Sequence, residues 1–201
     1  MTTQGSCQTY DFQTYREASK RLVDAVDGVQ VQAACEALES VYWRGGTVFA
    51  CGNGGSAATA SHFVEDLAKL MWRPAEKARL KAHCLSDPTP FILALANDDG
   101  YEKIFSSQLS MQASAGDVVV CISGSGNSPN VVRAARWAKE NQVVSLGLTG
   151  YNGGLLAETV DINIHVASNN MGMLECTHML ILDFVSKDVR HRVHGVAHAE
   201  R

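Results

Sequence analysis

The stretch VVVCISGSGNSP, residues 118–129, joins an apolar run to a loop of serine and glycine that ends at a proline. An apolar run of this length, rich in valine, is typical of a parallel strand that is covered on both faces. Pro129 suits the first turn of a helix, where its missing N–H is not needed. The stretch therefore predicts a buried strand, a loop and a helix, which is the repeating unit of an α/β fold.

The same order of features occurs earlier in the chain. The run Thr47–Cys51 leads into the loop Gly52-Asn53-Gly54-Gly55-Ser56, and a helix is expected from Ala57 onward. Glycines let the backbone approach an anion closely, and the start of a helix offers free N–H groups and partial positive charge. One glycine-rich turn is weak evidence on its own. Two such loops beyond strands of one sheet indicate a phosphate-binding site, since ligands of open parallel sheets bind at that edge.

The remaining elements alternate between short β-rich runs and helical runs from Gly46 onward, which predicts parallel strands joined by crossover helices. The expected strands are Thr47–Cys51, Lys81–Leu85, Val118–Ile122, Val143–Leu148 and Ile162–Val166. The expected helices are Ala57–Leu70, Pro90–Asn97, Glu102–Ala113, Pro129–Glu140 and Gly172–Arg190. We expect one doubly wound domain over residues 46–201. Residues 1–45 form two helices, at about 12–26 and 29–44, which could pack on their own core or across a subunit boundary.

The composition narrows the classes of ligand and location. The 201 residues carry a net charge of −4 and a pI near 5.9, so nothing in the total charge attracts nucleic acid or an anionic membrane. No signal peptide and no membrane-spanning apolar stretch is apparent, and we expect a cytoplasmic protein without a membrane partner. The six cysteines contain no C-x-x-C pair, so free thiols are expected.

Several of these motifs together resemble the sugar isomerase (SIS) domain, and more narrowly its phosphoheptose isomerase branch. They are GNGGS after one strand, ISGSGNSPN after another, Asn97-Asp98 between them and Leu148-Thr149-Gly150 after the next. The resemblance runs from about Gly45 to Asp183. It implies a flavodoxin-like five-stranded fold and a homotetramer with active sites at subunit boundaries. It also implies the conversion of sedoheptulose 7-phosphate to a heptose 7-phosphate, without a nucleotide cofactor.

The resemblance also implies substrate contacts residue by residue. Asn53, Gly54, Gly55 and Ser56 would border the sugar. The loop Ser123, Gly124, Ser125 and Ser128 would hold the phosphate through hydroxyl and backbone N–H groups, with no lysine or arginine. Asn97 and Asp98 would reach sugar hydroxyls, although the residues alone indicate a helix end before the Asp99-Gly100 turn.

Aldose–ketose isomerisation moves a proton between adjacent carbons, so it requires a base near the carbon that loses the proton. The first candidates for this base lie on the first crossover helix. His62 is followed by Glu65 and Asp66 at i+3 and i+4, so either carboxylate can share a face with the imidazole. From the residues alone, His62 is either a ligand or a half-buried helix residue. The family has a metal-binding histidine at this position and a glutamate base where this chain has Asp66. Asp66 is therefore our candidate base, with Glu65 in reserve.

The last helix departs further from the family, whose zinc site is completed by a glutamine and a histidine eight residues apart. Alignment on Gly172 places them at Glu175 and Asp183, whereas a shift of one residue gives Leu174 and Leu182. The predicted metal ligands are His62, Asp66, Glu175 and Asp183, with zinc as the candidate ion. Glu175 is also a predicted substrate contact. Asp183 and His178 are further candidates for acid–base catalysis. Eight helical residues rise roughly 12 Å, so Glu175 would have to precede the helix, or another subunit contribute, for one ion to be shared.

Two other functions remain open on this sequence. A non-catalytic SIS protein that senses a sugar phosphate, or that binds another protein as the replication-initiator-associating protein does, would keep the same phosphate loops. A lyase acting on a phosphorylated amino sugar is the third. The isomerase is favoured because acid–base groups persist, in altered form, at His62, Asp66, Glu175, His178 and Asp183.

Overall fold

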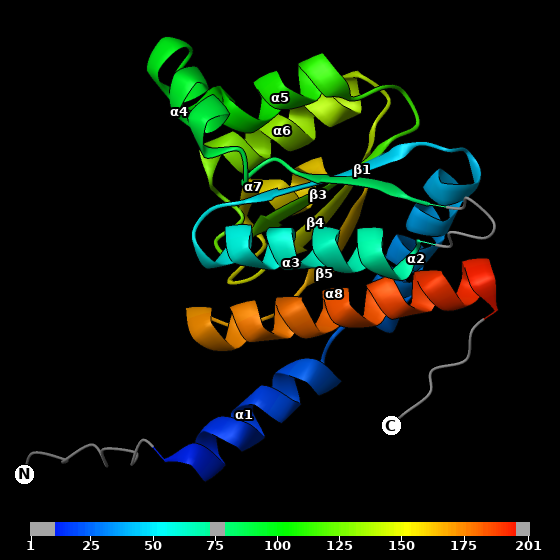
Figure 1. Ribbon diagram of the computed structural model, residues 1–201. Coiled ribbons are helices and arrows are strands. Elements are labelled where there is room, and N and C mark those ends of the chain that lie inside the picture. Colours follow the sequence, from blue (N-terminus) through cyan, green and yellow to red (C-terminus); the bar gives the residue numbers. More distant parts are fainter. Residues whose placement is uncertain (1–10, 73–78, 196–201) are drawn as a thin grey trace, which may run out of the picture.

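The computed structural model describes residues 11–72 and 79–195 and is built around a five-stranded parallel sheet (Figure 1). Its strands are β1 (Thr47–Gly52), β2 (Lys81–Cys84), β3 (Val118–Ser123), β4 (Val144–Thr149) and β5 (Ile162–His165). They lie in the order β2-β1-β3-β4-β5. This is the flavodoxin-like order, in which the chain changes direction across the sheet between β1 and β3. The predicted fold is confirmed, and each strand lies within one residue of its predicted bounds.

Helices cover both faces of the sheet. On one face lie α2 (Gly28–Trp43), α3 (Gly55–Leu70) and α8 (Met171–His194), and the other carries α4 (Thr89–Asp98), α5 (Ile104–Gln112), α6 (Pro129–Glu140) and α7 (Gly154–Thr159). A 3₁₀ turn, η2 (Tyr101–Lys103), precedes α5. Residues of β3 alternate between the two hydrophobic cores that this arrangement creates, with Val120 in one and Cys121 in the other. This alternation explains why the whole strand is apolar.

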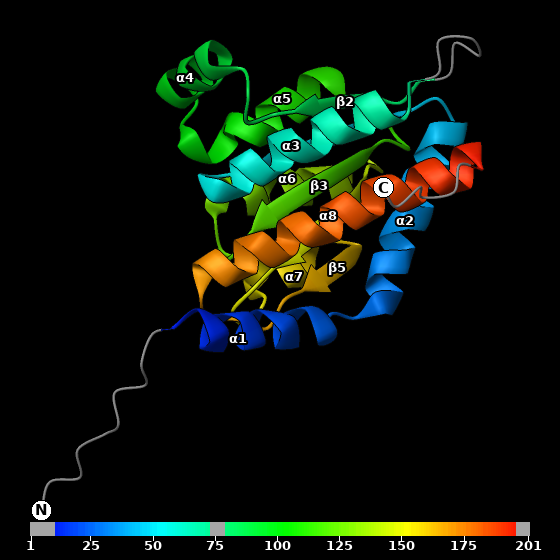
Figure 2. The same cartoon turned by 60° about the horizontal axis from the view of Figure 1, so that its bottom comes forward.

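The two leading helices differ in how they pack. Five residues of α2 are buried in the core beneath the sheet, including Cys35 and Leu38. Helix α1 (Phe12–Asp24) begins at the N-cap Asp11, whose carboxylate accepts from the Thr14 N–H at 2.9 Å, and has no fully buried residue. It lies beside α8 in both views (Figures 1 and 2). Thus α2 belongs to the core of its own chain, whereas α1 lies on its surface.

Helix α7 was not predicted, and it is only six residues long. The described cysteines, Cys35, Cys51, Cys84, Cys121 and Cys176, are all free, as expected; Cys7 lies outside the described residues. None of the helices within residues 11–72 and 79–195 combines the length and the apolar character needed to cross a membrane.

Candidate active site

The loops after β1 and β3 meet at the switch point of the sheet and enclose a cavity of about 260 Å³. Two residues from the start of α8 complete its wall. The lining residues are Asn53, Gly54, Gly55, Ser56, Ile122, Ser123, Gly124, Ser125, Ser128, Met171 and Glu175. The structure therefore brings together both predicted phosphate cradles and the predicted contact Glu175, which are far apart in the sequence.

The loop after β1 presents the beginning of α3 to the cavity. Gly54 precedes the helix with φ +55° and ψ −121°, a backbone conformation that a side chain would strain. No side chain caps the helix, which begins at Gly55. The first N–H groups of a helix have no intrahelical partner and attract negative charge. This end of α3 is thus suited to an anionic or hydroxyl-bearing ligand.

The loop after β3 offers hydroxyl groups without positive charge. Ser123 donates its hydroxyl hydrogen to Ser128 Oγ at 3.1 Å, and Ser125 Oγ accepts from the Asn127 N–H at 3.2 Å. None of the described residues that line the cavity is lysine or arginine. A phosphate here would be held by hydroxyl and backbone N–H groups, as expected from the acidic composition.

Asn53 is held in place by two residues that the sequence analysis did not identify. Its side-chain amide pairs reciprocally with that of Asn130, with N···O distances of 2.9 and 2.8 Å. Tyr101 also donates its hydroxyl hydrogen to Asn53 Oδ1 at 2.9 Å. Asn130 is buried and is the last residue of the ISGSGNSPN motif, so the motif could have identified it as a site residue. No sequence motif identifies Tyr101, because only the fold brings η2 close to the loop after β1.

Glu175 reaches the start of α3 from α8. A Cβ built on Gly55 would overlap both of its carboxylate oxygens, so the two residues are in direct contact. Among the described residues that line the cavity, Glu175 is the one ionisable side chain. Helix α8 begins at Met171, so Glu175 lies inside the helix. The alternative that Glu175 precedes the helix is therefore wrong.

The predicted acid–base pair on α3 forms, but it lies farther along the helix than the residues that line the cavity. His62 Nε2 lies 3.2 Å from Asp66 Oδ2, with the imidazole half exposed and the carboxylate more buried. Glu65 instead lies 3.6 Å from the Lys69 ammonium on the exposed side. Neither His62 nor Asp66 lines the cavity. Gly55, His62 and Asp66 are separated by seven and four residues, so they share one face of α3.

The other predicted site residues lie away from the cavity. Asp183 forms an ion pair with Lys187 at 2.7 Å. His178 is fully buried, and its Nε2–H donates to the Thr149 carbonyl at 3.2 Å, while burial lowers the pKa of the imidazole to about 4. Asn97 and Asp98 are exposed at the end of α4, where the Asn97 amide donates to Asp98 at 2.7 Å. Their proposed contacts with the sugar stay predictions.

The predicted metal ligands do not converge within one chain. Within the described ranges, no three histidine, cysteine, aspartate or glutamate side chains are placed to hold a metal ion. Glu175 and Asp183 lie on one unbroken helix and are separated by roughly 12 Å of rise. The ammonium of Lys187 also already neutralises Asp183. The residues of a single chain therefore do not fit the four-ligand site that the sequence resemblance implied.

Comparison with known proteins places the chain in a family. Residues 14–150 match the model of the SIS domain. The phosphoheptose isomerase of Mycobacterium tuberculosis (strain ATCC 25177 / H37Ra) is 35% identical over 192 residues, which cover 95% of this chain and 96% of that protein. The solved structure of the phosphoheptose isomerase of Neisseria gonorrhoeae has a TM-score of 0.81 at 30% identity, and covers 88% of this chain and 95% of its own.

A second solved structure, a phosphoheptose isomerase from Francisella tularensis, also has a TM-score of 0.81, at 28% identity over 89% of this chain and 96% of its own. The match to the domain model includes both loops of the cavity and helix α3. The match to the domain model, the sequence identity and the strand order agree, and the chain belongs to the SIS domain family.

Proposed function

We propose that this protein is a phosphoheptose isomerase, which interconverts sedoheptulose 7-phosphate and a heptose 7-phosphate through an enediolate. Relatives that share about a third of its residues over nearly their whole length carry that name. The observation that carries the proposal is the cavity at the β1/β3 switch point. It combines two phosphate-type loops with one carboxylate, Glu175, in a chain that has no net positive charge.

The phosphate end of the substrate is assigned to the loop after β3. Ser123 and Ser128 share one hydrogen bond with each other, and either hydroxyl can rotate to donate to a phosphate oxygen instead. Ser125 and the backbone of Gly124 complete this side of the cavity. The sugar chain would then extend past Asn53, Gly54, Gly55 and Ser56 toward α3.

The reacting carbons lie at the opposite end of the substrate from its phosphate. An extended chain advances about 3.5 Å for every three bonds, so a seven-carbon phosphate spans about 10 Å. His62 follows Gly55 by seven residues on the same face of α3, a rise of about 10.5 Å. A sugar whose phosphate is held by the loop after β3 and whose chain runs along α3 points its C1–C2 end toward the His62–Asp66 pair. We assign Asp66 as the base, with Glu65 in reserve, and Glu175 as a contact to sugar hydroxyls.

Three roles that were predicted from the sequence have no part in this scheme: the acid–base roles of His178 and Asp183, and the metal. His178 faces Thr149 in the core and Asp183 is paired with Lys187, so neither contributes an acid–base step in this scheme. A divalent metal, with zinc as the candidate, stays a prediction that requires a ligand from another subunit. No step is assigned to it here.

A homotetramer with active sites at subunit boundaries is part of the proposal. Apolar side chains are exposed on neighbouring helices, with Phe12 on α1 79% exposed and Leu180 and Phe184 on α8 about half exposed. Helices α1 and α8 lie side by side (Figure 2). Exposed apolar surface of this kind is typical of subunit contacts. Light scattering on the purified protein would measure the assembly. A cytoplasmic location also stays a prediction.

The experiment that tests the function is turnover of sedoheptulose 7-phosphate in D₂O, followed by proton NMR. An isomerase that uses an enediolate incorporates deuterium at the carbon that receives the proton from the base. The assay is run with zinc, and with a chelator in its place, so that metal dependence is read separately. Tight binding of the sugar phosphate, with neither product nor deuterium in any condition, would refute the isomerase.

That outcome would support the alternative, a sugar-phosphate sensor. One observation favours it: the cavity itself contains a single ionisable group, whereas isomerisation requires at least one base and a means of stabilising the enediolate. The arrangement of His62 and Asp66 on the same face as Gly55 favours the enzyme, because a binding protein has no need of that pair.

A further inference from the structure

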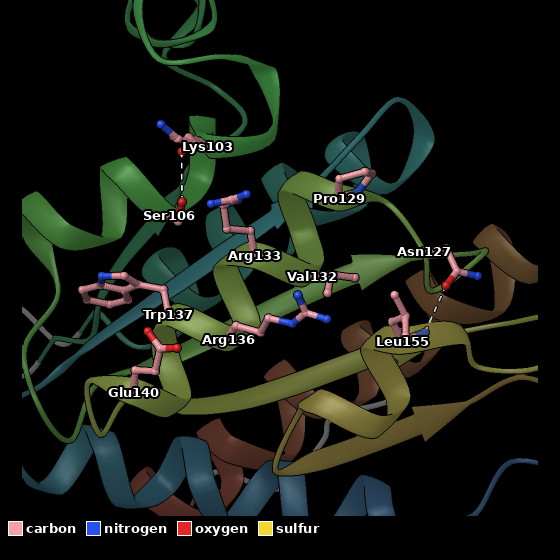
Figure 3. Close-up of a pocket in the computed structure, with 10 residues that line it drawn as sticks. All are labelled: Lys103, Ser106, Asn127, Pro129, Val132, Arg133, Arg136, Trp137, Glu140 and Leu155. Carbon is pink, nitrogen blue, oxygen red and sulfur yellow. Dashed lines mark hydrogen bonds between the residues drawn. The ribbon is translucent and has the colours of Figure 1, made fainter.

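A second cavity, of about 450 Å³, lies on the opposite face of the sheet from α3 and α8 (Figure 3). It is formed by η2 and α5 on one side, the outer face of α6 below, and the start of α7. Its lining residues are Lys103, Ser106, Asn127, Pro129, Val132, Arg133, Arg136, Trp137, Glu140 and Leu155. Its volume is in the range of small-molecule sites, and it contains none of the residues assigned to the isomerase reaction.

The charge of this second cavity differs from that of the protein as a whole. Three cationic side chains line it, Lys103, Arg133 and Arg136, together with one carboxylate, Glu140, in a chain whose net charge is −4. None of the three has an ion pair with another described residue. Arg133 and Arg136 are three residues apart on α6, a spacing at which like charges repel. Such a cluster is stabilised when an anion neutralises it.

The three cations are spread over the cavity. Figure 3 shows the guanidinium of Arg133 pointing toward Lys103 and Ser106, while that of Arg136 points toward Leu155. One phosphate group would satisfy one of these positions and leave the other without a partner. Because guanidinium groups bind phosphate oxygens in a bidentate manner, the arrangement suits a ligand with more than one phosphoryl group.

An aromatic surface lies at one end of the cavity. Trp137 is half-buried against the core and lines the same cavity, with its indole on the opposite side of α6 from the guanidinium of Arg136 (Figure 3). Tryptophan and arginine together are a common platform for the flat ring of a nucleobase. We propose that this second cavity binds a nucleotide with two or more phosphates, as an effector and not as a reactant. The phosphates contact Arg133, Arg136 and Lys103, and the base contacts Trp137.

The second cavity is joined to the candidate active site by one residue. Asn127 lines it, and its side chain accepts from the Leu155 N–H at 3.1 Å and donates to the Ser125 carbonyl at 3.0 Å. Ser125 lines the candidate active site. A ligand that contacts Asn127 therefore acts on the loop that holds the substrate phosphate. The direct test is nevertheless binding, which does not depend on isomerase activity.

The test is isothermal titration of the full-length protein with ADP, in the presence of EDTA and at about 0.1 M salt. ADP is expected to bind, adenosine is expected not to, and pyrophosphate is expected to bind more weakly than ADP. Arg133→Ala and Arg136→Ala are each expected to weaken ADP binding by about tenfold to a hundredfold, the range of charge-assisted hydrogen bonds. Trp137→Phe, which keeps an aromatic ring in the core, is expected to weaken ADP but not pyrophosphate.

Lys139→Ala is the matched control, because Lys139 is an exposed cation on the same helix that does not line the cavity. It is expected to leave ADP binding unchanged. The proposal is overturned if ADP does not bind, or if Lys139→Ala weakens ADP binding as much as the arginine variants do. It is also overturned if sedoheptulose 7-phosphate displaces ADP competitively, since ADP would then occupy the first cavity. Thermal unfolding confirms that each variant is folded.

Discussion

The carboxylate of Glu175 lies directly against the backbone of Gly55, so that no side chain can be accommodated on that glycine without moving it. The contact joins the start of α8 to the start of α3 across the mouth of the cavity. It also places a negative charge at the positive end of a helix dipole, where it is stabilised. The position of Glu175 therefore depends on the absence of one methyl group.

Gly55→Ala is expected to displace Glu175 and to reduce kcat/KM for sedoheptulose 7-phosphate by about a hundredfold, the effect of moving a substrate-positioning group by about 1 Å. Gly28→Ala is the control, because Gly28 is also the first residue of a helix and a Cβ there meets no atom within 4 Å. Steady-state kinetics on both variants provide the measurement. Equal activity in the two variants would contradict the role given to this contact.

Asp66→Asn is expected to lower kcat by between about a hundredfold and ten-thousandfold, the range for loss of a general base, with a smaller change in KM. Glu65→Gln is the internal comparison, since Glu65 interacts with Lys69 on the exposed side of α3. Deuterium incorporation from D₂O measures the proton transfer itself. If Glu65→Gln abolishes incorporation and Asp66→Asn does not, the reserve candidate is the base.

His178 is expected to make the protein less stable in acid. Burial lowers the pKa of its imidazole to about 4, below the ordinary value of 6.5, so the unfolded chain binds the proton more readily than the folded one. The stabilisation is complete above pH 6.5 and is lost as pH falls toward 4, by roughly 3 kcal/mol at most. Urea unfolding at pH 7 and pH 5 measures the difference, which should be smaller in His178→Gln. An unchanged difference would show that other groups cause it.

Asn130→Asp is expected to destabilise the fold by about 1–3 kcal/mol, because a carboxylate cannot donate the hydrogen bond that Asn53 Oδ1 now accepts. It should also raise KM, since Asn53 then loses a bond that fixes the first loop. Asn152→Asp is the control: the Asn152 side chain only accepts, from the Gly154 N–H, and a carboxylate can do the same. Chemical denaturation and KM are the two measurements, and equal effects of the two substitutions would argue against the Asn53–Asn130 pair.

The sequence predicted those features that depend on local pattern. The stretch 118–129 correctly indicated β3, its loop and the start of α6, and the two glycine-rich loops were correctly expected at one edge of the sheet. Helix α7 was missed because six residues that follow one positive-φ glycine, Gly153, and begin at another, Gly154, offer no helical period to detect. The buried position of His178 could have been predicted from the sequence. Leu174, His178, Ile181 and Val185 follow the spacing of one helix face, and that face is buried.

Other features required the fold itself. Asn53, Tyr101 and Asn130 come from three separate segments, and only their tertiary arrangement makes them partners. The metal prediction depended on which side chains of α3 and α8 approach one another, and that is set by how the two helices pack. The cationic cavity on α6 was missed because Lys103 and Arg133 are 30 residues apart, so no motif connects them.

The exposed position of α1 has a thermodynamic consequence. A helix of 13 residues that buries none of them gains little stability within its own chain. If the exposed Phe12 side of α1 is covered by a second copy, part of the free energy of folding is supplied by association and follows mass action. The melting temperature would then rise with protein concentration, and dilution alone would release α1 before the sheet unfolds.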